Sequence, residues 1–289
     1  MKSLKTLVID GNNLIHRTYW IAKHRSAESP EQINNFHIFL TLNAIFSYVS
    51  AYNPDYIYSA WDEKPDYEAN IRKSMLTEYK GNRSSDIMPH QNNEIIKQLF
   101  NSLGIHSVFP RELEADDVIA YICKQTPGHK KIISVDKDFL QLINNDVVLY
   151  DPIRKDETDI NNFAENTGYS NVDDWMTAKC LSGDKSDNVP GIPKFGKVTI
   201  QKYLTGTITL TTEQQEIFNR NREIFTLNKY STIDREFAYY TDQLKECIKQ
   251  DWDKFLDLCN EHELFSITKN KLKWYNLFFL KSKLSLLFN

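Results

Sequence analysis

Three apolar runs in this chain each end on an aspartate, and this pattern constrains the fold more than any other feature. The aspartates are Asp10, Asp62 and Asp136, which follow residues 6–9, 56–61 and 132–135 in turn. Short runs rich in β-branched and aromatic residues are typical of buried strands. Ligands bind at the carboxyl ends of the strands of a parallel sheet, so the three aspartates are expected to converge at that edge.

Two further acidic clusters, residues 114–117 and 183–188, can join the same edge. Two carboxylates about 4 Å apart repel by about 4 kcal/mol at an effective dielectric of about 20, so cations must lie among them. Oxygen ligands select hard ions, and Mg²⁺ binds a few carboxylates while it also takes phosphate oxygens from a substrate. The pattern therefore predicts a metal-dependent phosphodiesterase.

The order of predicted elements indicates an α/β fold. Strand and helix patterns alternate through the first half of the chain, which favours a parallel sheet, whereas the chain from residue 172 onward is mostly helical. Residues 67–92 are polar, with few apolar anchors, and are expected to form an exposed excursion. We therefore predict an α/β core over residues 1–170 and a helical region over residues 171–289.

Composition excludes several classes of protein. The 289 residues are 41% hydrophobic, enough for a substantial core, and the net charge of -4 does not exclude nucleic acid if bound metal offsets the acidic cluster. The four cysteines are far apart in the sequence, which favours a reduced chain and a cytoplasmic location over a disulfide framework or zinc site. Nothing in the sequence is expected to cross a membrane.

Six motifs occur in a collinear order: residues 10–11, Asp62, residues 79–83, 114–117, 136–138 and 183–191. Together they resemble the 5′-nuclease or flap endonuclease family, from about residue 5 to about residue 205. The likeness is greatest to the 5′→3′ exonuclease domain of bacterial DNA polymerase I and to the stand-alone bacteriophage enzymes. No polymerase domain follows in the sequence, so a free-standing enzyme of phage type, active in a bacterial or phage-infected cell, is expected.

The resemblance implies a PIN-like, mainly parallel central sheet with flanking helices, a helical arch at about residues 67–92 and two divalent ions. Mg²⁺ is the expected ion, and Mn²⁺ is expected to substitute for it. By matching positions, the first ion is assigned to Asp10, Asp62, Glu114 and Asp116, and the second to Asp136, Asp138 and Asp187. Asp117 and Asp184 would assist directly or through water. The expected product carries a 5′-phosphate.

The resemblance also implies contacts with DNA. Lys80 and Arg83 match the cations of the arch that meet the scissile phosphate, and Arg17 and Arg72 match basic positions that contact other phosphates. Residues 189–204 resemble a helix-three-turn-helix element that holds duplex DNA through Gly191, Gly196 and Lys197 and binds K⁺ in relatives. Here Lys197 stands one position earlier than the lysine of the family pattern.

The predicted function is that of a structure-specific 5′ nuclease, with exonuclease and flap endonuclease modes. Its substrates would be DNA with a 5′ flap, a nick or an RNA primer, and the enzyme would act as a monomer. The alternatives are a PIN-type ribonuclease, which lacks the glycine turn after the last aspartates, and a catalytically silent DNA-junction binding module. The C-terminal stretch, residues 269–287, is expected to pack on the body of the protein, with binding to a replication protein as the alternative.

Overall fold

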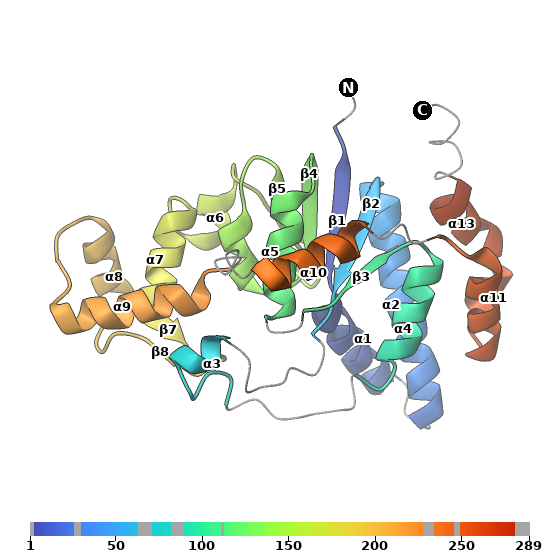
Figure 1. Ribbon diagram of the computed structural model, residues 1–289, viewed down its shortest axis with the longest axis horizontal. Coiled ribbons are helices and arrows are strands. Elements are labelled where there is room, and N and C mark those ends of the chain that lie inside the picture. The colour runs from blue at the N-terminus through green and yellow to red at the C-terminus, as the bar shows by residue number, and fades with distance from the viewer. Residues whose placement is uncertain are drawn as a thin grey trace.

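The computed structural model describes residues 3–25, 30–62, 71–81, 90–110, 113–227, 234–245 and 249–280. A central sheet lies between two helical layers; residues 172–225 extend to one side of the sheet, whereas residues 252–280 lie on the other side (Figure 1). Of the predicted arch, the structure describes residues 71–81 and 90–92, and Arg83 lies outside the described residues.

The central sheet has six strands, in the order β3-β2-β1-β4-β5-β6. They are β1 (Lys5–Asp10), β2 (Tyr56–Ala60), β3 (His106–Val108), β4 (His129–Ile133), β5 (Val147–Asp151) and β6 (Asp156–Thr158). The first five strands are parallel, and β6 pairs antiparallel with β5. The predicted α/β fold with a mainly parallel sheet is confirmed.

The strand register places the predicted aspartates at one edge. Asp10, the last residue of β1, pairs with Ala60 at the end of β2, and Ile9 pairs with Ile133 at the end of β4. Asp62 and Asp136 follow two and three residues after the ends of their strands. Because β2 and β4 flank β1, all three aspartates leave the sheet at the carboxyl ends of adjacent strands.

Alternation along the strands builds a core on each face of the sheet. Leu7 and Ile9 of β1 point into one cluster, whereas Val8 between them points into the other. Ile132 and Ile133 of β4 divide between the two clusters in the same way. β1 and β4 are thus apolar on both faces, as expected for the parallel strands of a sheet that is covered by helices.

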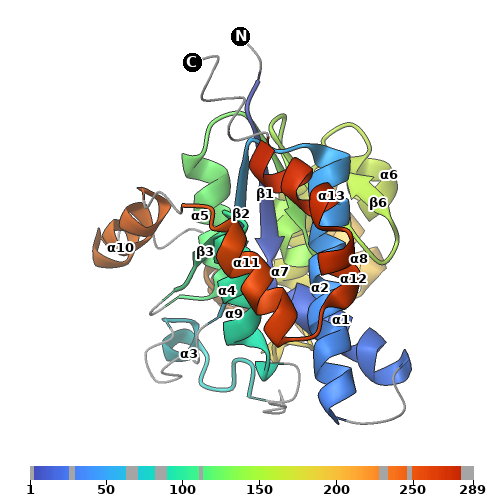
Figure 2. The same ribbon diagram turned by 90° about the vertical axis from the view of Figure 1, so that its right-hand side faces the viewer.

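The first helical layer comprises α1 (Gly11–Arg25), α2 (Pro30–Tyr52) and α4 (Asn93–Ser102). The chain's last elements pack against this layer and are α11 (Trp252–Glu261), α12 (Phe265–Lys269), α13 (Lys271–Tyr275) and the π-helical turn η3 (Asn276–Leu280) (Figure 2). Trp274, Phe278 and Phe279 are buried there. The expectation that this stretch packs on the body of the protein is confirmed as far as residue 280.

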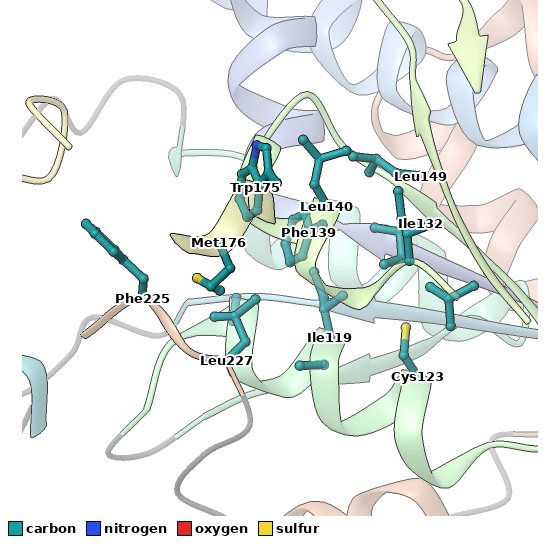
Figure 3. Close-up of a cluster of buried hydrophobic side chains, with 14 of the residues drawn as sticks. Ile119, Cys123, Ile132, Phe139, Leu140, Leu149, Trp175, Met176, Phe225 and Leu227 are labelled. Atoms are coloured by element: carbon teal, nitrogen blue, oxygen red, sulfur yellow. The ribbon is translucent and has the colours of Figure 1, made fainter. Parts of the chain in front are cut away.

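The second layer contains α5 (Ala115–Gln125), the 3₁₀ helix η2 (Lys137–Leu142), α6 (Phe163–Thr167), α7 (Val172–Ser182), α8 (Lys197–Leu204), α9 (Thr212–Phe225) and α10 (Asp234–Lys245). The short helix α3 (Ile71–Met75) lies against α9. Figure 3 shows part of the core of this layer, where Ile119 of α5, Phe139 of η2 and Met176 of α7 lie in one buried cluster.

The sequence did not predict three short strands. β6 consists of polar residues without apolar alternation, so no period marks it as a strand. β7 (Gly183–Asp184) and β8 (Val189–Pro190) pair antiparallel, and each is too short to show a pattern. None of the helices in the described ranges has the length and apolar character required to span a bilayer.

Candidate active site at the carboxyl edge of the sheet

Asp10 occupies the centre of the site. The chain turns from β1 directly into α1 at Gly11, where a Cβ atom would lie 2.6 Å from the Trp61 ring, so only glycine fits without displacement. The backbone N–H of Asn13 donates to Asp10 Oδ1 (3.0 Å), and the Ser134 hydroxyl donates to Asp10 Oδ2 (2.7 Å). These bonds fix the orientation of a carboxylate that is 6% exposed.

Asp62 joins the end of β2 to the start of α5. Its Oδ1 accepts from the backbone N–H of Ala115 (2.7 Å), and its Oδ2 accepts from Asn12 Nδ2 (3.0 Å). The first N–H groups of a helix have no partner within the helix, and they favour negative charge. Asp62 therefore holds α5 in place at this edge of the sheet.

Glu114 is the N-cap residue of α5 and is surrounded by cationic groups. Lys80 Nζ lies 2.7 Å from its Oε1, Arg72 Nη1 lies 3.3 Å from its Oε2, and the Tyr79 hydroxyl donates to Oε2 (3.0 Å). Burial alone would raise the pKa of Glu114, but Lys80 and Arg72 outweigh burial and lower that pKa to about 2. Glu114 is ionised throughout the physiological range.

Asp117 lies behind Glu114 in a buried ion pair. Arg72 donates to both Asp117 oxygens, at 2.6 and 2.8 Å, and the two residues are 2% and 1% exposed. The sequence predicted a phosphate contact for Arg72, but its guanidinium faces Asp117 and Glu114 inside the protein rather than the surface. Both oxygens of Asp117 are already used, so Asp117 orients Arg72 and, through it, Glu114.

A second group of carboxylates follows β4. The backbone N–H of Asp136 donates to the Ser134 hydroxyl (3.0 Å), and that of Asp138 donates to Asp136 Oδ1 (2.8 Å). Lys179 of α7 forms ion pairs with Asp138 and with Asp184, whose Oδ2 lies 3.1 Å from its ammonium. Ser134, which also binds Asp10, therefore connects this group to the centre of the site.

Residues 79–80 link the two groups of carboxylates. The Tyr79 hydroxyl that donates to Glu114 also lies 3.5 Å from Asp187 Oδ2, and the backbone N–H of Lys80 donates to the carbonyl of Asp187 (2.8 Å). Asp187 is 7% exposed. This part of the predicted arch therefore holds the Asp187 loop against the amino end of α5.

Several of these carboxyl groups carry raised pKa values. Burial raises the pKa of Asp10 to about 7, and the charges of Asp136 and Asp62 add to the effect. Burial and the charges of Asp136 and Asp10 also raise the pKa of Asp116 well above its ordinary range. Burial raises the pKa of Asp138 to about 6, although Lys179 opposes it. The site carries more negative charge than its own cations offset, which is the environment that a bound divalent cation relieves.

In the described part of the chain, no three carboxylate, histidine or cysteine side chains are already arranged as a ligand group for one ion. The carboxylate oxygens bind instead to ammonium groups and N–H donors of the site itself. Lys80 pairs with Glu114, and Lys179 pairs with Asp138 and Asp184. The all-oxygen donor set and the raised pKa values fit hard divalent cations. To bind them, the carboxylates would have to release Lys80 and Lys179 by rotation of the side chains.

The predicted DNA-binding turn lies between α7 and α8. At Gly191 a Cβ atom would lie 2.1 Å from the Ser182 carbonyl oxygen, so the backbone of β8 can approach α7 only at a glycine. Gly196 is the N-cap residue of α8 and has open space around it. Lys197 is exposed, and the neighbouring Val198 is 71% exposed. The structure therefore places Gly196 and Lys197 on an accessible surface.

Arg17 lies apart from the carboxylates. Its Nη2 donates to the Tyr48 hydroxyl (2.9 Å), and its side chain lines a pocket of about 630 Å³ between α1, α2 and the turn after β5. No contact within the described ranges joins Arg17 to the acidic residues.

Sequence reasoning missed four residues that organise the site: Asn12, Tyr79, Ser134 and Lys179. Each binds a carboxylate that comes from a distant part of the sequence, Asp138 in the case of Lys179, so only the folded chain reveals the pair. Lys179 had one local signal, because it lies five residues before Asp184 at the end of a largely buried helix.

A parallel sheet with buried, mutually repelling carboxylates at its carboxyl edge defines an α/β protein with an acidic site suited to divalent cations. Comparison with known families gives the particular class. The family model described as "5′-3′ exonuclease, N-terminal resolvase-like domain" matches residues 5–168. The chain belongs to this 5′-3′ exonuclease family, and the resemblance found in the sequence is confirmed.

Individual relatives agree with this assignment. A 5′-3′ exonuclease from Mycoplasmopsis pulmonis is 31% identical over 255 residues, which cover 81% of this chain and 82% of the relative. A flap endonuclease Xni from Shewanella denitrificans is 29% identical over 196 residues, covering 66% and 73%. The DNA polymerase I of Caldicellulosiruptor bescii is 30% identical over 216 residues, and the match covers 70% of this chain but 24% of that longer protein.

The fold is shared with a solved structure. The flap endonuclease of bacteriophage T5, crystallised as a pseudo-enzyme-product complex with DNA and metal ions, superposes with a TM-score of 0.64 at 21% identity. The match covers 83% of this chain and 98% of the T5 chain.

Proposed function

We propose that this protein is a structure-specific 5′ nuclease that hydrolyses DNA phosphodiesters with two divalent ions. The observation that carries the proposal is the convergence of carboxylates at the carboxyl edge of the sheet, where burial and mutual repulsion raise the pKa values of Asp10, Asp116 and Asp138. The names of the family and of the sequence relatives, 5′-3′ exonuclease and flap endonuclease, support the same activity.

The matching positions of the family divide the proposed ion ligands into two groups. Asp10, Asp62, Glu114 and Asp116 would hold one ion, and Asp136, Asp138 and Asp187 the other, with Asp184 assisting directly or through water. When bound, such ions lower the pKa of a water nucleophile and offset charge on the phosphodiester. Mg²⁺ is the proposed ion because the donors are all oxygen, and Mn²⁺, which prefers similar ligands, is the proposed substitute.

The chain's own residues would position and polarise the substrate. Lys80, within the predicted arch, pairs with Glu114 in the acidic site, and its ammonium group can move from Glu114 to the scissile phosphate. The open amino end of α8 at Gly196 and Lys197 is the proposed contact with duplex DNA, since helix amino ends favour phosphate, and K⁺ is the proposed ion at this turn. The proposed substrates are DNA with a 5′ flap, a nick or an RNA primer.

A matched pair of variants tests this proposal. Asp136→Ala removes a carboxylate from the site, whereas Asp253→Ala removes an exposed one from α11. We expect Asp136→Ala to lower Mg²⁺-dependent cleavage of a labelled 5′-flap duplex by more than about 100-fold, because even the outer partners of metal ligands contribute 10–100-fold. Binding of the same DNA in Ca²⁺ should remain, and Asp253→Ala should cleave like the parent.

The same assay separates the proposal from its rivals. Equal cleavage by Asp136→Ala and the parent would remove the active-site assignment. Cleavage of single-stranded RNA in preference to the flap would instead favour a PIN-type ribonuclease. Tight junction binding by the parent without cleavage in Mg²⁺ or Mn²⁺ would favour a silent DNA-binding module.

A further inference from the structure

Helix α9 contacts two segments that carry acidic residues of the site, and through Arg72 it is linked to a third. It lies beyond residue 168, where the match to the family model ends. We propose that α9 is a brace that sets the relative positions of the carboxylates, and that Asn221 is its principal positioning residue. We define the α9 brace as the Asn221 side chain together with the Ile224 and Phe225 carbonyls. The proposal rests on the proposed function, because it concerns the same ion-binding residues.

Asn221 fixes the loop that carries Asp184 and Asp187. Its side chain is fully buried, and Nδ2 donates to the carbonyls of Cys180 and Pro190, each at 2.9 Å. These two carbonyls lie at either end of the loop, one at the end of α7 and one in β8. The loop therefore cannot shift relative to α9 without breaking a buried hydrogen bond, and an unpaired buried carbonyl is costly.

The Ile224 carbonyl fixes the group around Glu114. It accepts from Arg72 Nε (2.8 Å), and the same guanidinium pairs with Asp117 and Glu114. The last carbonyls of a helix have no partner within the helix, and they favour a nearby cation. Arg72 therefore connects the carboxyl end of α9 to the amino end of α5.

The Phe225 carbonyl fixes the segment of Asp138. It accepts from Gln141 Nε2 (3.0 Å), and this amide also donates to the carbonyl of Asp138 (2.8 Å). Gln141 Oε1 in turn accepts from the backbone N–H of Leu227 (2.9 Å). In Figure 3, Phe225 and Leu227 lie beside Met176 in the buried cluster that also contains Phe139.

These three attachments give α9 a role that a general packing helix would not have. Two groups of carboxylates that come from different parts of the chain are joined to the same 14-residue helix, over its last two turns. A rigid helix transmits the position of one group to the other, so the spacing available to a pair of ions depends on α9. Loss of the Asn221 amide should loosen the Asp184 and Asp187 loop while it leaves every proposed ligand in the sequence.

The test compares the full-length parent with Asn221→Leu and with Asn219→Leu, the same substitution at an exposed position of α9. Binding of Mn²⁺ alone is measured by electron paramagnetic resonance, and the Mg²⁺ concentration for half-maximal cleavage is measured with 5′-flap DNA. We expect Asn221→Leu to weaken Mn²⁺ binding by about tenfold and to raise the half-maximal Mg²⁺ concentration similarly, the range seen when partners of metal ligands are lost. Asn219→Leu should match the parent.

Two further variants separate positioning from lost stability. Phe255→Leu weakens the core on the opposite face of the sheet, so it should lower the melting temperature without changing Mn²⁺ affinity. If Asn221→Leu does not fold, Asn221→Ala replaces it, because it removes the donor to the two carbonyls without adding bulk or charge to the buried position.

Parent-like Mn²⁺ affinity in the folded Asn221 variant would overturn the brace, and so would an equal loss of affinity in Phe255→Leu. If the parent cleaves flap DNA and binds Mn²⁺, either of these results leaves the proposed function intact. A parent that neither binds Mn²⁺ nor cleaves DNA would overturn the proposed function together with the brace.

Discussion

Lys80 adopts a backbone conformation that lysine rarely adopts. Its φ angle is 53°, and its ammonium lies 2.7 Å from Glu114 Oε1. Left-handed conformations of non-glycine residues cost about 1 kcal/mol or more and are common at functional sites. The neighbouring backbone bond to the Asp187 carbonyl helps to hold this conformation. The exposed Lys155 and Lys194 share the left-handed conformation, so it is the ion pair with Glu114 that distinguishes Lys80 from a solvent-exposed lysine.

Replacement of Lys80 should therefore affect the chemical step more than binding. In Lys80→Ala we expect the single-turnover rate on a 5′-flap duplex to fall by about 100-fold, the loss typical of one removed donor to transition-state charge. The DNA dissociation constant in Ca²⁺ should change little. Lys254→Ala, at an exposed position of α11, is the control. An unchanged rate constant in Lys80→Ala would contradict the assignment.

The sequence predicted individual site residues only where a local pattern marked them. Asp10, Asp62 and Asp136 follow apolar runs, and the structure brings them to adjacent strand ends as expected. Arg72 and Lys179 could not be placed in the same way. The burial of Arg72 depends on Asp117 and on the end of α9, which are distant in sequence, so its match to a basic position of the family suggested a phosphate contact instead.

The hairpin of β7 and β8 depends on close approach between backbones. Gly191→Ala would place a Cβ atom 2.1 Å from the Ser182 carbonyl, whereas Gly196→Ala meets nothing within 4 Å. We expect Gly191→Ala to lower the free energy of unfolding by about 1–3 kcal/mol, as overpacking does. Gly196→Ala should cost less than about 1 kcal/mol, as the loss of a glycine N-cap does. Urea denaturation measures both values.

We expect the two glycine variants to differ in DNA binding in the same way as in stability. Gly191→Ala should weaken binding to duplex DNA in Ca²⁺ more than Gly196→Ala, because it displaces the turn that leads to α8. Equal stability and equal affinity of the two variants would show that the close approach at Gly191 is relieved elsewhere in the chain.

Among the helices and strands, the longer ones could be predicted from the sequence and the shortest could not. The long apolar runs of β1, β2 and β4 and the helical pattern before residue 52 correspond to observed elements. The 3-residue β6 and the 2-residue β7 and β8 have no internal period, because hydrogen bonds to neighbouring segments rather than side-chain pattern define them.

For the molecule as a whole, the buried carboxylates should make stability without ions depend on pH. The pKa of Asp10 rises from 3.8 to about 7 on folding. Between these values the folded chain binds more protons than the unfolded chain at this position, so rising pH lowers the free energy of unfolding. Asp138, with a pKa of about 6, contributes in the same direction. Above pH 7, where both groups are ionised in the folded chain, the free energy of unfolding has fallen by the full amount that they contribute.

Asp10→Asn should remove the loss of stability that ionisation of Asp10 causes, because an amide stays uncharged. At pH 8 in a chelator we expect its melting temperature to exceed that of the parent by about 2–4 °C, the change that about 1 kcal/mol gives in a chain of this size. At pH 4 the difference should disappear. Added Mg²⁺ should stabilise the parent more than the variant, since an ion that binds the folded state raises its stability. Differential scanning calorimetry of both proteins, with Asp253→Asn as control, measures these shifts.

The antiparallel strand β6 affects how copies of this molecule meet at high concentration. It places Asp156 and Glu157 at one border of the sheet, and Glu157 pairs with Lys131. At the opposite border, Gln243 bonds both backbone groups of Phe109, just after β3. Charged or occupied borders discourage another chain from adding a strand, so the sheet is a poor template for cross-β aggregation despite its apolar interior.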